Sequence, residues 1–599
     1  MHLFLLKIRS VISRHRLALV AAFLVGLIYG GPHIWFAATN DSYQGIPLMQ
    51  SANEDFYLAR MQEIIDGHPL VGSHGYFEYK DQFPLAPPTA EFLYALPTLI
   101  FGISIITTLT ASKFLFPFIL FLLAYALIYQ LMGKEDSLSQ KISAVAGGLF
   151  VTLGYDLVDY KTVFGYIAGS LAPGGWLIWS RPVNPILGAI FLFAFLLFVW
   201  TIIKKRKTDK SAILGASLFL AFMISSYFFS WGIGLSILFI MGLIYLLKHD
   251  YAKVKRLVFV FVIGVGLSLP YWYLSWQAKQ SPWYEDSVLR SGLFYTRYPV
   301  LNKVLLASLA LYAVILFLGF LKDSKTFKFK NWHFFIFSFL AGGIFAFSQQ
   351  IITGMTIWPF HFVQYTIPLS IVALMVVFFR YAHERWGLLW KGAVGIILLA
   401  SLWFGIYTQY STYITFVDHF VSIQPYMKVF DWLNSQEKDC VVLSVGGEDL
   451  DQVREIKGMI PAFTHCNQYA YSWFYSLVPE DRIYYSYLVN LRLRGVTSQG
   501  IEDYIKKNRA EANVFLSSNW KGFYQIKNFP DFEDKKLSER LKNLPADYRA
   551  FLKKDFGTEL EKYRLDYILS IGPLREDIKN QLTNLKLATE IDGIFLYQF

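Results

Sequence analysis

A short stretch in the first polar segment of the chain carries residue types that could do acid–base and anion chemistry. It contains Asn53, Glu54, Asp55 and Arg60. A carboxylate can take or orient a proton, and a guanidinium can hold an anionic group. Charges beside a membrane are costly unless they pair or serve such chemistry. We therefore interpret this stretch as one wall of an active site at the outer face of a membrane.

The spacing of apolar residues predicts a helix through this stretch. One face of the helix would carry Tyr57, Met61, Ile64 and Ile65, at i, i+4, i+7 and i+8. We expect such a helix to lie along the membrane interface. A purely structural interpretation also fits, because Ser51-x-x-Glu54 is a capping box and acids in the first turn suit the helix dipole.

A second acidic group follows the third apolar run. Asp156 and Asp159 are expected at or just inside the outer boundary of the hydrocarbon, where a charge requires a partner or a water-filled cleft. Glycines and prolines then lead to Arg181, which opens the next apolar run. Two interpretations of Arg181 stay open: its guanidinium reaches to lipid headgroups, or it binds a substrate phosphate.

Two further outer loops bring polar groups to the same side. The loop Ser281–Pro299 contains Arg297 and could close over a site, although a solvated loop explains it equally well. A later loop presents Gln350, Trp358, His361 and Gln364. A histidine at an interface is more often a structural hydrogen-bonding group, and a tryptophan there more often belongs to an aromatic belt.

The composition indicates that a membrane holds these loops. The chain has 599 residues, of which 55% are hydrophobic and 17% are charged, and its mean hydropathy is +0.38. These values predict a polytopic α-helical membrane protein with room for one further domain. The net charge of +11 does not indicate nucleic-acid binding, because many basic residues lie in short loops between apolar runs. Two cysteines exclude a disulfide-dense scaffold and a cysteine-rich metal site.

The apolar runs predict eleven transmembrane helices. They are expected at residues 17–36, 107–132, 142–156, 185–203, 211–229, 231–247, 257–275, 301–321, 332–350, 363–379 and 392–408. A further apolar helix, from Pro87 to Gly102, is expected to lie beside the membrane or to re-enter it. Every second loop is then rich in lysine and arginine. This places the N-terminus in the cytoplasm and the C-terminal end outside a plasma membrane.

Residues 411–599 differ in composition from the membrane domain of residues 1–410 and predict an extracytoplasmic α/β domain. Short apolar runs, such as Cys440–Val445 and Tyr567–Ile571, alternate there with helical patterns. Cys440 and Cys466 both lie in this domain, on the oxidising side. A disulfide between them and two free thiols are equally weighted outcomes.

Several common catalytic motifs are absent from the sequence. It contains no GxxxxGK[ST], no placed GxGxxG, no HExxH and no CxxC. Nucleotide-loop ATPases, Rossmann enzymes and the common zinc hydrolases therefore have no support. A lipid or solute transporter stays open as an alternative, although its usual sign, paired broken helices with charges near mid-membrane, is not evident. A receptor or assembly scaffold is a third alternative.

The arrangement of these features resembles the GT-C superfamily of membrane glycosyltransferases. It has one basic-flanked span, a large first outer loop with an acidic helix start, a second acidic outer loop and an outer C-terminal domain. Asn53–Arg60 resembles the first-loop motif of oligosaccharyltransferase catalytic subunits and protein O-mannosyltransferase-like enzymes, in which an aspartate precedes an aromatic residue and then an arginine. Asp156 and Asp159 correspond to the second-loop motif. A Trp-Trp-Asp sequon-reading motif is absent, which speaks against N-glycosylation of proteins.

The resemblance implies an inverting transfer of a sugar from a polyprenyl phosphate to a glycan, lipid or protein acceptor at the outer face. Asp55 is the candidate base, and the further catalytic candidates are Glu54, Asp156 and Asp159. The candidate ligands for a divalent cation, Mg²⁺ or Mn²⁺ if one is used, are Asp55, Asp156 and Asp159. The leaving phosphate would be bound by Arg181, Arg297 and His361. Other substrate contacts are assigned to Arg60, Gln350, Gln364 and Trp358.

Overall fold

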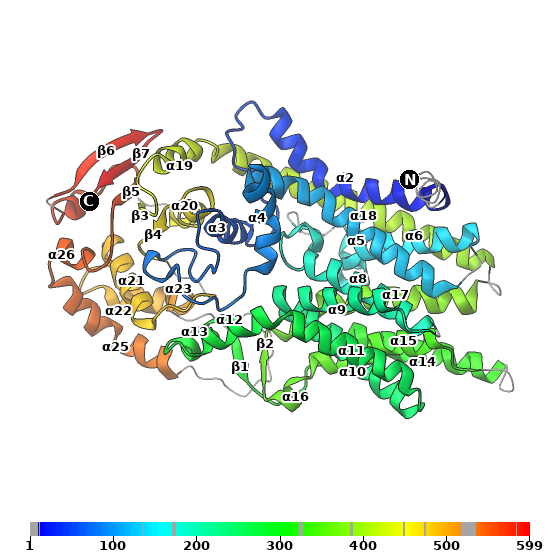
Figure 1. The fold of residues 1–599 in the computed structure, drawn as a ribbon. Coiled ribbons are helices and arrows are strands. Elements are labelled where there is room, and N and C mark those ends of the chain that lie inside the picture. Colours follow the sequence, from blue (N-terminus) through cyan, green and yellow to red (C-terminus); the bar gives the residue numbers. More distant parts are fainter. Residues whose placement is uncertain are drawn as a thin grey trace.

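The chain forms a bundle of long helices joined to a mixed region of helices and sheet (Figure 1). The computed structural model describes residues 10–599 except 11, 134–135, 170–174, 206, 323–327, 384–386, 447–449, 472–474, 517–534 and 583. The loops that the sequence predicts to lie outside the membrane, called the outer loops below, lie between the two regions (Figure 1). The start of α2 (Arg16–Thr39) and the C-terminal Phe599 lie toward opposite ends of the molecule (Figure 1).

Eight helices of the described residues are long and apolar enough to cross a membrane. They are α2 (Arg16–Thr39), α5 (Ile105–Met132), α8 (Ile186–Lys204), α10 (Phe228–Leu247), α14 (Lys303–Lys322), α15 (Asn331–Phe347), α17 (Val363–Ala382) and α18 (Gly387–Ser422). The span of α15 continues to Thr353, and the span of α17 begins at Pro359. A ninth span results if α11 (Tyr251–Leu267) and α12 (Leu269–Lys279), which meet at a bend of 55°, are counted together. The protein is therefore a multi-pass membrane protein.

The predicted count of eleven spans is not confirmed in the described part of the chain. At the predicted span 142–156 the structure has α6 (Leu138–Thr152), with 15 residues, and at 211–229 it has α9 (Lys210–Ser226), with 17. An α-helix needs about 20 residues to cross the hydrocarbon, so α6 falls short and α9 lies at the lower limit. The helix predicted from Pro87 to Gly102 is α4 (Thr89–Phe101), which is also too short to span.

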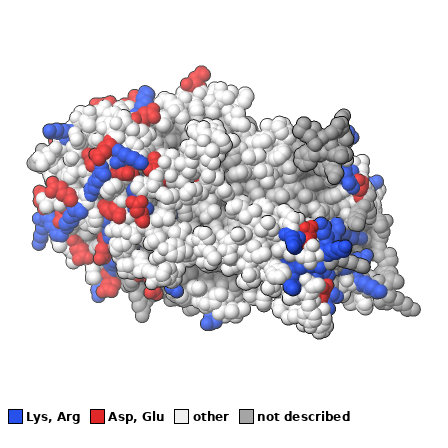
Figure 2. Space-filling view, in the orientation of Figure 1, with Lys and Arg blue, Asp and Glu red and all other residues white. Residues whose placement is uncertain are grey.

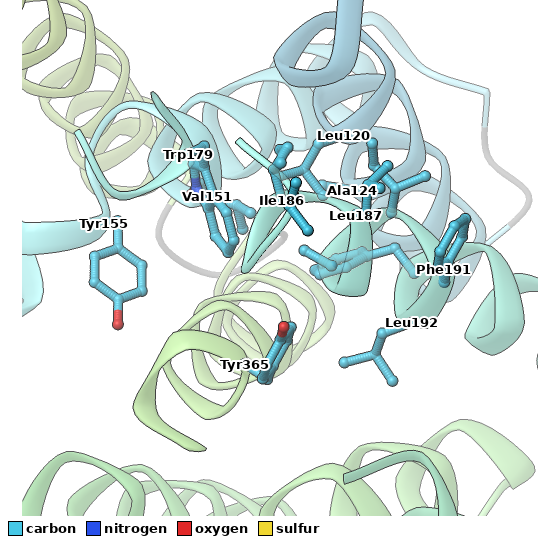
Figure 3. Packing of buried hydrophobic residues seen from close by; sticks show 14 of the residues in the cluster. Leu120, Ala124, Val151, Tyr155, Trp179, Ile186, Leu187, Phe191, Leu192 and Tyr365 are labelled. Atoms are coloured by element: carbon cyan, nitrogen blue, oxygen red, sulfur yellow. Dashed lines mark hydrogen bonds between the residues drawn. The ribbon is translucent and has the colours of Figure 1, made fainter. Parts of the chain in front are cut away.

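The centre of the helical bundle is built around α8. This helix is apolar on all sides and largely buried, as expected of a helix without a polar face. Ile186, Leu187 and Phe191 of α8 lie in one hydrophobic core with Leu120 of α5 and Tyr365 of α17 (Figure 3). By contrast, only 17% of the apolar window of α14 and 28% of that of α18 is buried, as expected of lipid-facing helices. The core fixes the outer ends of α5, α8 and α17, next to which the polar site residues lie.

Short elements make up the outer loops. They are α3 (Glu54–Ile65), η1 (Phe77–Tyr79), α4, η2 (Tyr155–Val158), α7 (Tyr160–Ile167), η3 (Ile178–Ser180), α13 (Tyr284–Ser291), β1 (Leu293–Tyr295), α16 (Gln350–Thr353), β2 (Met355–Ile357) and η4 (Pro359–Phe362). β1 and β2 pair antiparallel, with Leu293 opposite Ile357. This pairing joins the loop before α14 to the loop before α17.

Helix α3, which the sequence predicts to lie along the membrane interface, is buried among other parts of the protein. Phe56, Leu58, Arg60 and Glu63 are buried, together with most of the helix. The reason is tertiary, because α4 packs on one side of α3 and α20 (Leu450–Phe463), from the C-terminal region, packs on another.

The C-terminal region has the predicted α/β character. Its sheet has the strand order β4-β3-β5-β7-β6, in which β3 is parallel to β4 and β5, and β7 is antiparallel to β5 and β6. The strands are β3 (Val441–Gly446), β4 (Asn467–Gln468), β5 (Tyr567–Ile571), β6 (Lys586–Ile591) and β7 (Ile594–Gln598). The helices are α19 (Tyr426–Asn434), α20, α21 (Glu480–Leu493), α22 (Ile501–Lys507), α23 (Arg509–Leu516), α25 (Lys535–Leu552), α26 (Phe556–Leu560) and α27 (Glu576–Lys579). α18 continues to Ser422, past the boundary expected at residue 410.

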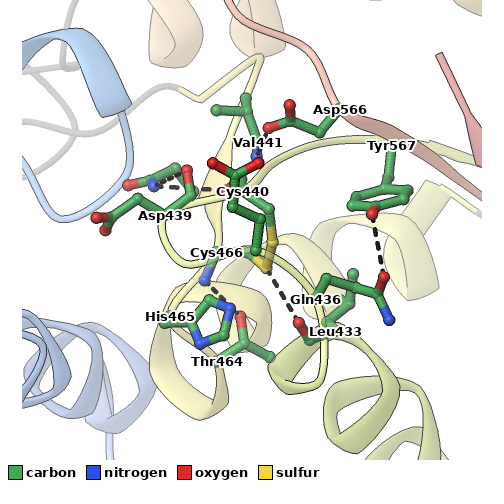
Figure 4. The surroundings of a disulfide bond; sticks show 12 residues. Leu433, Gln436, Asp439, Cys440, Val441, Thr464, His465, Cys466, Asp566 and Tyr567 are labelled. Atoms are coloured by element: carbon green, nitrogen blue, oxygen red, sulfur yellow. Dashed lines mark hydrogen bonds between the residues drawn. A yellow bond between two sulfur atoms is a disulfide. The ribbon is translucent and has the colours of Figure 1, made fainter.

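Cys440 and Cys466 form a disulfide, which was one of the two outcomes left open by the sequence (Figure 4). Cys440 directly precedes β3, and Cys466 directly precedes β4. The bond therefore joins the starts of two neighbouring parallel strands. His465 and Thr464 lie beside it (Figure 4).

Charged side chains divide along the molecule. Acids and bases are mixed over the helix–sheet region, whereas lysines and arginines gather at the far end of the helical bundle, with a nearly uncharged zone between them (Figure 2). The loops from α8 to α9 and from α10 to α11 supply Lys205, Lys207 and Lys248, and the start of α11 supplies Lys255. A membrane around the uncharged zone would leave these basic loops on one side.

Candidate active site

A cavity of about 1000 Å³ lies where the outer loops meet the membrane helices. Part of its apolar wall runs along α10 and α11 and consists of Leu235, Leu238, Phe239, Leu243, Leu246, Leu257 and Phe261. Gly242 also lines the cavity, and a side chain added there would meet no neighbouring atom. From Phe228 to Leu246, α10 rises about 27 Å, which approaches the thickness of the hydrocarbon layer.

Helix α3 forms the polar end of this cavity. Asn53, Phe56, Tyr57 and Arg60 line it, at the spacing i, i+3, i+4 and i+7 of one helix face. Asn53 begins the helix with a φ of 62°, a left-handed conformation that asparagine adopts more readily than most residues. Asp55 lies about 200° around the helix from Asn53. Asp55 is therefore on another face and is not part of the cavity wall.

Arg181 reaches the same end of the cavity from the segment before α8. Its Nη2 donates to the Tyr57 hydroxyl at 3.0 Å, and its guanidinium carbon lies 5.4 Å from the centre of the Tyr57 ring. Burial raises the pKa of the Tyr57 hydroxyl, which stays protonated. The Arg181 Nε is enclosed and has no hydrogen-bond partner among the described residues. An enclosed donor without a partner costs about 1–3 kcal/mol. The position of Arg181 therefore favours the interpretation that it binds a substrate group with a hydrogen-bond acceptor over the interpretation that it reaches to lipid headgroups.

Arg60 is held beside this site by the turn before α4 and by α4 itself. Its Nε donates to Glu91 Oε1 at 2.6 Å, and its Nη2 donates to the Ala86 carbonyl at 2.8 Å. Only 1% of Arg60 is exposed, and its Nη1 has no partner among the described residues. Arg60 and Arg181 therefore each bring one enclosed, unpaired N–H to the polar end of the cavity.

Glu54 is buried outside the cavity wall and is fully engaged. Its Oε1 accepts hydrogen bonds from the Ser51 amide and hydroxyl, and its Oε2 accepts one from Lys113 Nζ at 2.7 Å. The Ser51 amide contact is half of the capping box that the sequence suggested. Lys113, from α5, also donates to the Ser180 carbonyl at 2.5 Å. Glu54 thus has a structural partner for each oxygen.

Asp55 faces the C-terminal region. A side chain on Gly458 of α20 would come within 2.5 Å of Asp55 Oδ2, so the carboxylate lies directly against this helix. Burial, together with the nearby Asp55 carboxylate, raises the pKa of Glu455. The sequence-based candidate base is therefore placed at the contact between α3 and α20.

Asp156 and Asp159 do not reach the cavity either. Asp156 is half-buried in η2, and the exposed Asp159 caps α7 by accepting a hydrogen bond from the Lys161 amide. Among the described residues, the one group of three or more metal-ligating side chains with closely spaced ligand atoms is Cys440, His465 and Cys466. The three carboxylates Asp55, Asp156 and Asp159 are not brought together as the predicted cation site, so we derive no step through a metal.

His361 and Trp358 line the cavity with Arg181. The ring centres of His361 and Trp358 are 5.0 Å apart, and the His361 ring is 5.1 Å from that of Phe229 at the start of α10. Both residues come from η4 and the residue before it. The structure therefore joins two of the predicted phosphate ligands, Arg181 and His361, in one wall.

The other predicted contacts lie outside the wall. Arg297 is exposed and donates to the carbonyls of Ile351 and Ile352. Gln350 is buried and donates to the Tyr298 carbonyl at 2.8 Å. The Oε1 of the buried Gln364 lies 3.5 Å from the Tyr227 hydroxyl. These side chains have structural partners, and none of Arg297, Gln350 and Gln364 lines the cavity.

Three residues of the site were not singled out from the sequence. Glu91 and Lys113 have a detectable signal, because each is a charge within an apolar run. Tyr475 has none. It comes from the C-terminal region, lines the cavity and places its ring centre 5.8 Å from that of Phe56.

Comparison with known proteins gives matches among solved structures. No protein-family model matches the chain, and no curated protein matches it in sequence. ArnT from Cupriavidus metallidurans bound to undecaprenyl phosphate aligns over 98% of this chain and 98% of its own, with 10% identity and a TM-score of 0.42. The Archaeoglobus fulgidus oligosaccharyltransferase in complex with Zn and sulfate aligns over 91% of this chain and 67% of its own, with 12% identity and a TM-score of 0.42.

A third match is the archaeal oligosaccharyltransferase AglB from Archaeoglobus fulgidus in complex with an inhibitory peptide and a dolichol-phosphate. It aligns over 93% of this chain and 69% of its own, with 13% identity and a TM-score of 0.42.

Proposed function

We propose that this protein transfers a sugar from a polyprenyl-phosphate donor to an acceptor at the outer face of the membrane. The observation that carries the proposal is the cavity, in which a long apolar wall ends at Arg60 and Arg181, each with an unpaired N–H. An apolar wall of this length suits an isoprenoid chain. Unpaired guanidinium donors suit the oxygens of a phosphate.

The apolar part of the cavity would hold the lipid tail. Phe239 and Leu243 on α10 and Phe261 on α11 line it and are each 40–50% exposed. In a membrane these faces meet lipid, so a tail can enter sideways from the bilayer. A tail lying along α10 places its phosphate near the start of that helix, where Tyr227 lines the cavity together with Arg181.

The arginines would stabilise the leaving group. When the bond between the anomeric carbon and the phosphate oxygen breaks, negative charge grows on the phosphate. Arg60 and Arg181 lie in an enclosed site, where attraction between charges is stronger than in water. Their partners Glu91 and Tyr57 hold them in place before the substrate arrives. His361 is our candidate for a further phosphate contact, and Trp358 for packing against the sugar ring.

The acceptor would enter from the outer side, where Tyr475 of the C-terminal region borders the cavity. Its oxygen attacks the anomeric carbon on the face opposite the phosphate, so the reaction inverts the configuration of that carbon. The acceptor is expected to be a glycan, a lipid or a protein, as the resemblance to membrane glycosyltransferases implies.

Binding and turnover by the purified protein in lipid nanodiscs test the proposal. Binding is measured with undecaprenyl phosphate, and turnover with a panel of polyprenyl-phosphate and polyprenyl-pyrophosphate sugars, with and without chelator. Arg181→Met should weaken binding about 10- to 100-fold, since a hydrogen bond to a charged group contributes about 1.5–3 kcal/mol. The affinity of Arg181→Lys should lie between those of the parent and Arg181→Met, because lysine keeps the positive charge but lacks the planar guanidinium group.

Arg549→Met is the matched control, because Arg549 lies on α25 outside the cavity wall, its side chain is 40% exposed, and it pairs with Glu502. It should bind as the parent does. Absence of binding by folded parent protein, or equal binding by Arg181→Met, would remove the donor site. Movement of lipid or solute across proteoliposomes without sugar transfer would support the transporter alternative instead.

A further inference from the structure

Glu91 is the one carboxylate among the described residues that line the cavity. It lies in the first turn of α4, three residues after Pro88, and is 5% exposed. A buried carboxylate in an otherwise apolar helix requires a partner or a function. Only one of the two Glu91 carboxylate oxygens has a hydrogen-bond partner among the described residues.

The two oxygens of Glu91 differ in their surroundings. Oε1 accepts the hydrogen bond from Arg60 Nε at 2.6 Å. Oε2 accepts no hydrogen bond from the described residues, and it is not one of their enclosed atoms. Because Glu91 lines the cavity, Oε2 is the oxygen that a bound molecule would meet. The contact with Arg60 fixes the orientation of the carboxylate.

The other acids of the outer loops are less suited to act in this cavity. Glu54 uses Oε1 for Ser51 and Oε2 for Lys113. Asp55 lies against Gly458, and neither Asp156 nor Asp159 lines the cavity. An acid–base group must reach the reacting proton, so its position is the first requirement.

We propose that Glu91 is the catalytic carboxylate that takes the proton from the acceptor. The inference rests on the proposed glycosyl transfer. The acceptor O–H bond breaks and its proton passes to Glu91 Oε2, while the acceptor oxygen forms a bond to the anomeric carbon. The bond from that carbon to the phosphate oxygen breaks, and its electron pair stays on the phosphate. The products are the glycosylated acceptor and the polyprenyl phosphate, and Glu91 later releases its proton to water.

The position of Glu91 links both halves of the step. Its Oε1 holds Arg60, which lines the cavity and is our candidate for a phosphate contact, and its Oε2 is offered to the acceptor. One carboxylate thus sets the distance between the group that receives the proton and a group that binds the leaving phosphate. A glutamine at this position keeps an oxygen for Arg60 but loses the ability to take the proton.

The test compares Glu91→Gln, Asp55→Asn and the parent for undecaprenyl phosphate binding and for turnover with the donor panel. Glu91→Gln should bind undecaprenyl phosphate within about twofold of the parent and should lose turnover at least about 100-fold, as expected for removal of a general base. Glu78→Gln is the matched control, because Glu78 also pairs with an arginine, Arg482, outside the cavity. It should keep the parent's turnover.

Four other outcomes would overturn the inference, and each would point to a different role for Glu91 or for the protein. Turnover by Glu91→Gln within about threefold of the parent shows that Glu91 takes no proton. Loss of binding together with turnover shows that Glu91 acts only by placing Arg60. Loss of turnover in Asp55→Asn but not in Glu91→Gln assigns the base to Asp55. A folded parent that neither binds undecaprenyl phosphate nor turns over any donor removes the proposed function and this inference with it.

Discussion

At the scale of single residues, Glu63 is a buried carboxyl group of the first outer loop whose ionisation is disfavoured by its surroundings. It is 4% exposed, and its Oε1 lies 3.3 Å from Lys80 Nζ, which is in turn 2.6 Å from Asp439. Its Oε2 has no hydrogen-bond partner among the described residues. Burial raises the pKa of Glu63 from its ordinary value to about 7, against the opposing effect of Lys80. The ionised form is thus disfavoured in the folded protein.

This pKa predicts that Glu63 makes the protein less stable as the pH rises. The contribution of the protonated carboxyl is fully present below the ordinary pKa of a glutamate and is lost as the pH rises through about 7. We expect the decrease in melting temperature between pH 5 and pH 8 to be larger for the parent than for Glu63→Gln by about 2 °C or more. Thermal unfolding of both proteins at the two pH values measures this, and parallel pH profiles would contradict it.

At the scale of elements, Lys113 holds two walls of the site at a fixed separation. It lies on α5 and is 4% exposed. Its ammonium binds Glu54 at the start of α3 and the carbonyl of Ser180, the residue before Arg181. The helix that carries Arg60 and the segment that carries Arg181 are therefore tied to the same atom.

Removal of this lysine should loosen both walls. Lys113→Met leaves the Glu54 carboxylate buried without its cation, and breaking a buried ion pair costs about 3–5 kcal/mol. We expect a lower melting temperature and weaker binding of undecaprenyl phosphate. The double variant Lys113→Met/Glu54→Gln should recover much of the stability, because no unpaired charge remains. If the double variant is no more stable than Lys113→Met, the unpaired Glu54 carboxylate is not the cause of the loss of stability.

At the scale of the whole molecule, the separation of charge fixes an expected orientation. Basic loops gather at one end of the helical bundle, and mixed charges cover the C-terminal region at the other (Figure 2). The disulfide between Cys440 and Cys466 fits an oxidising compartment for the C-terminal region. The cavity lies between these ends and is closed partly by Tyr475.

A reporter fused after Phe599 tests this orientation. We expect a C-terminal alkaline phosphatase fusion to be active and a C-terminal green fluorescent protein fusion to be dark when each is exported with the chain, because both should lie outside the cytoplasm. A reporter inserted in the basic loop after Lys205 is the matched control and should give the opposite pattern. The same pattern at both sites would contradict the assigned orientation.

Much of the architecture was determined by the sequence itself. Long apolar runs such as those of α5 and α8 must lie in a membrane, because only a helix satisfies the backbone there. The change of composition near residue 411 predicted the α/β region, and the strands at Val441–Gly446 and Tyr567–Ile571 are where the apolar runs placed them. The polar residues Arg60, Arg181, Trp358 and His361 were also identified from their types and positions.

Only the tertiary structure decided which polar groups share the cavity. The sequence favoured Asp55 as the site residue of this stretch, but the packing of α20 fixes the rotation of α3, so Asn53 lines the cavity and Asp55 lies against Gly458. The pairing of Glu54 with Lys113 and of Arg60 with Glu91 likewise joins separate helices. Residue spacing specifies the faces of one helix, whereas contacts between distant segments determine which face meets the site.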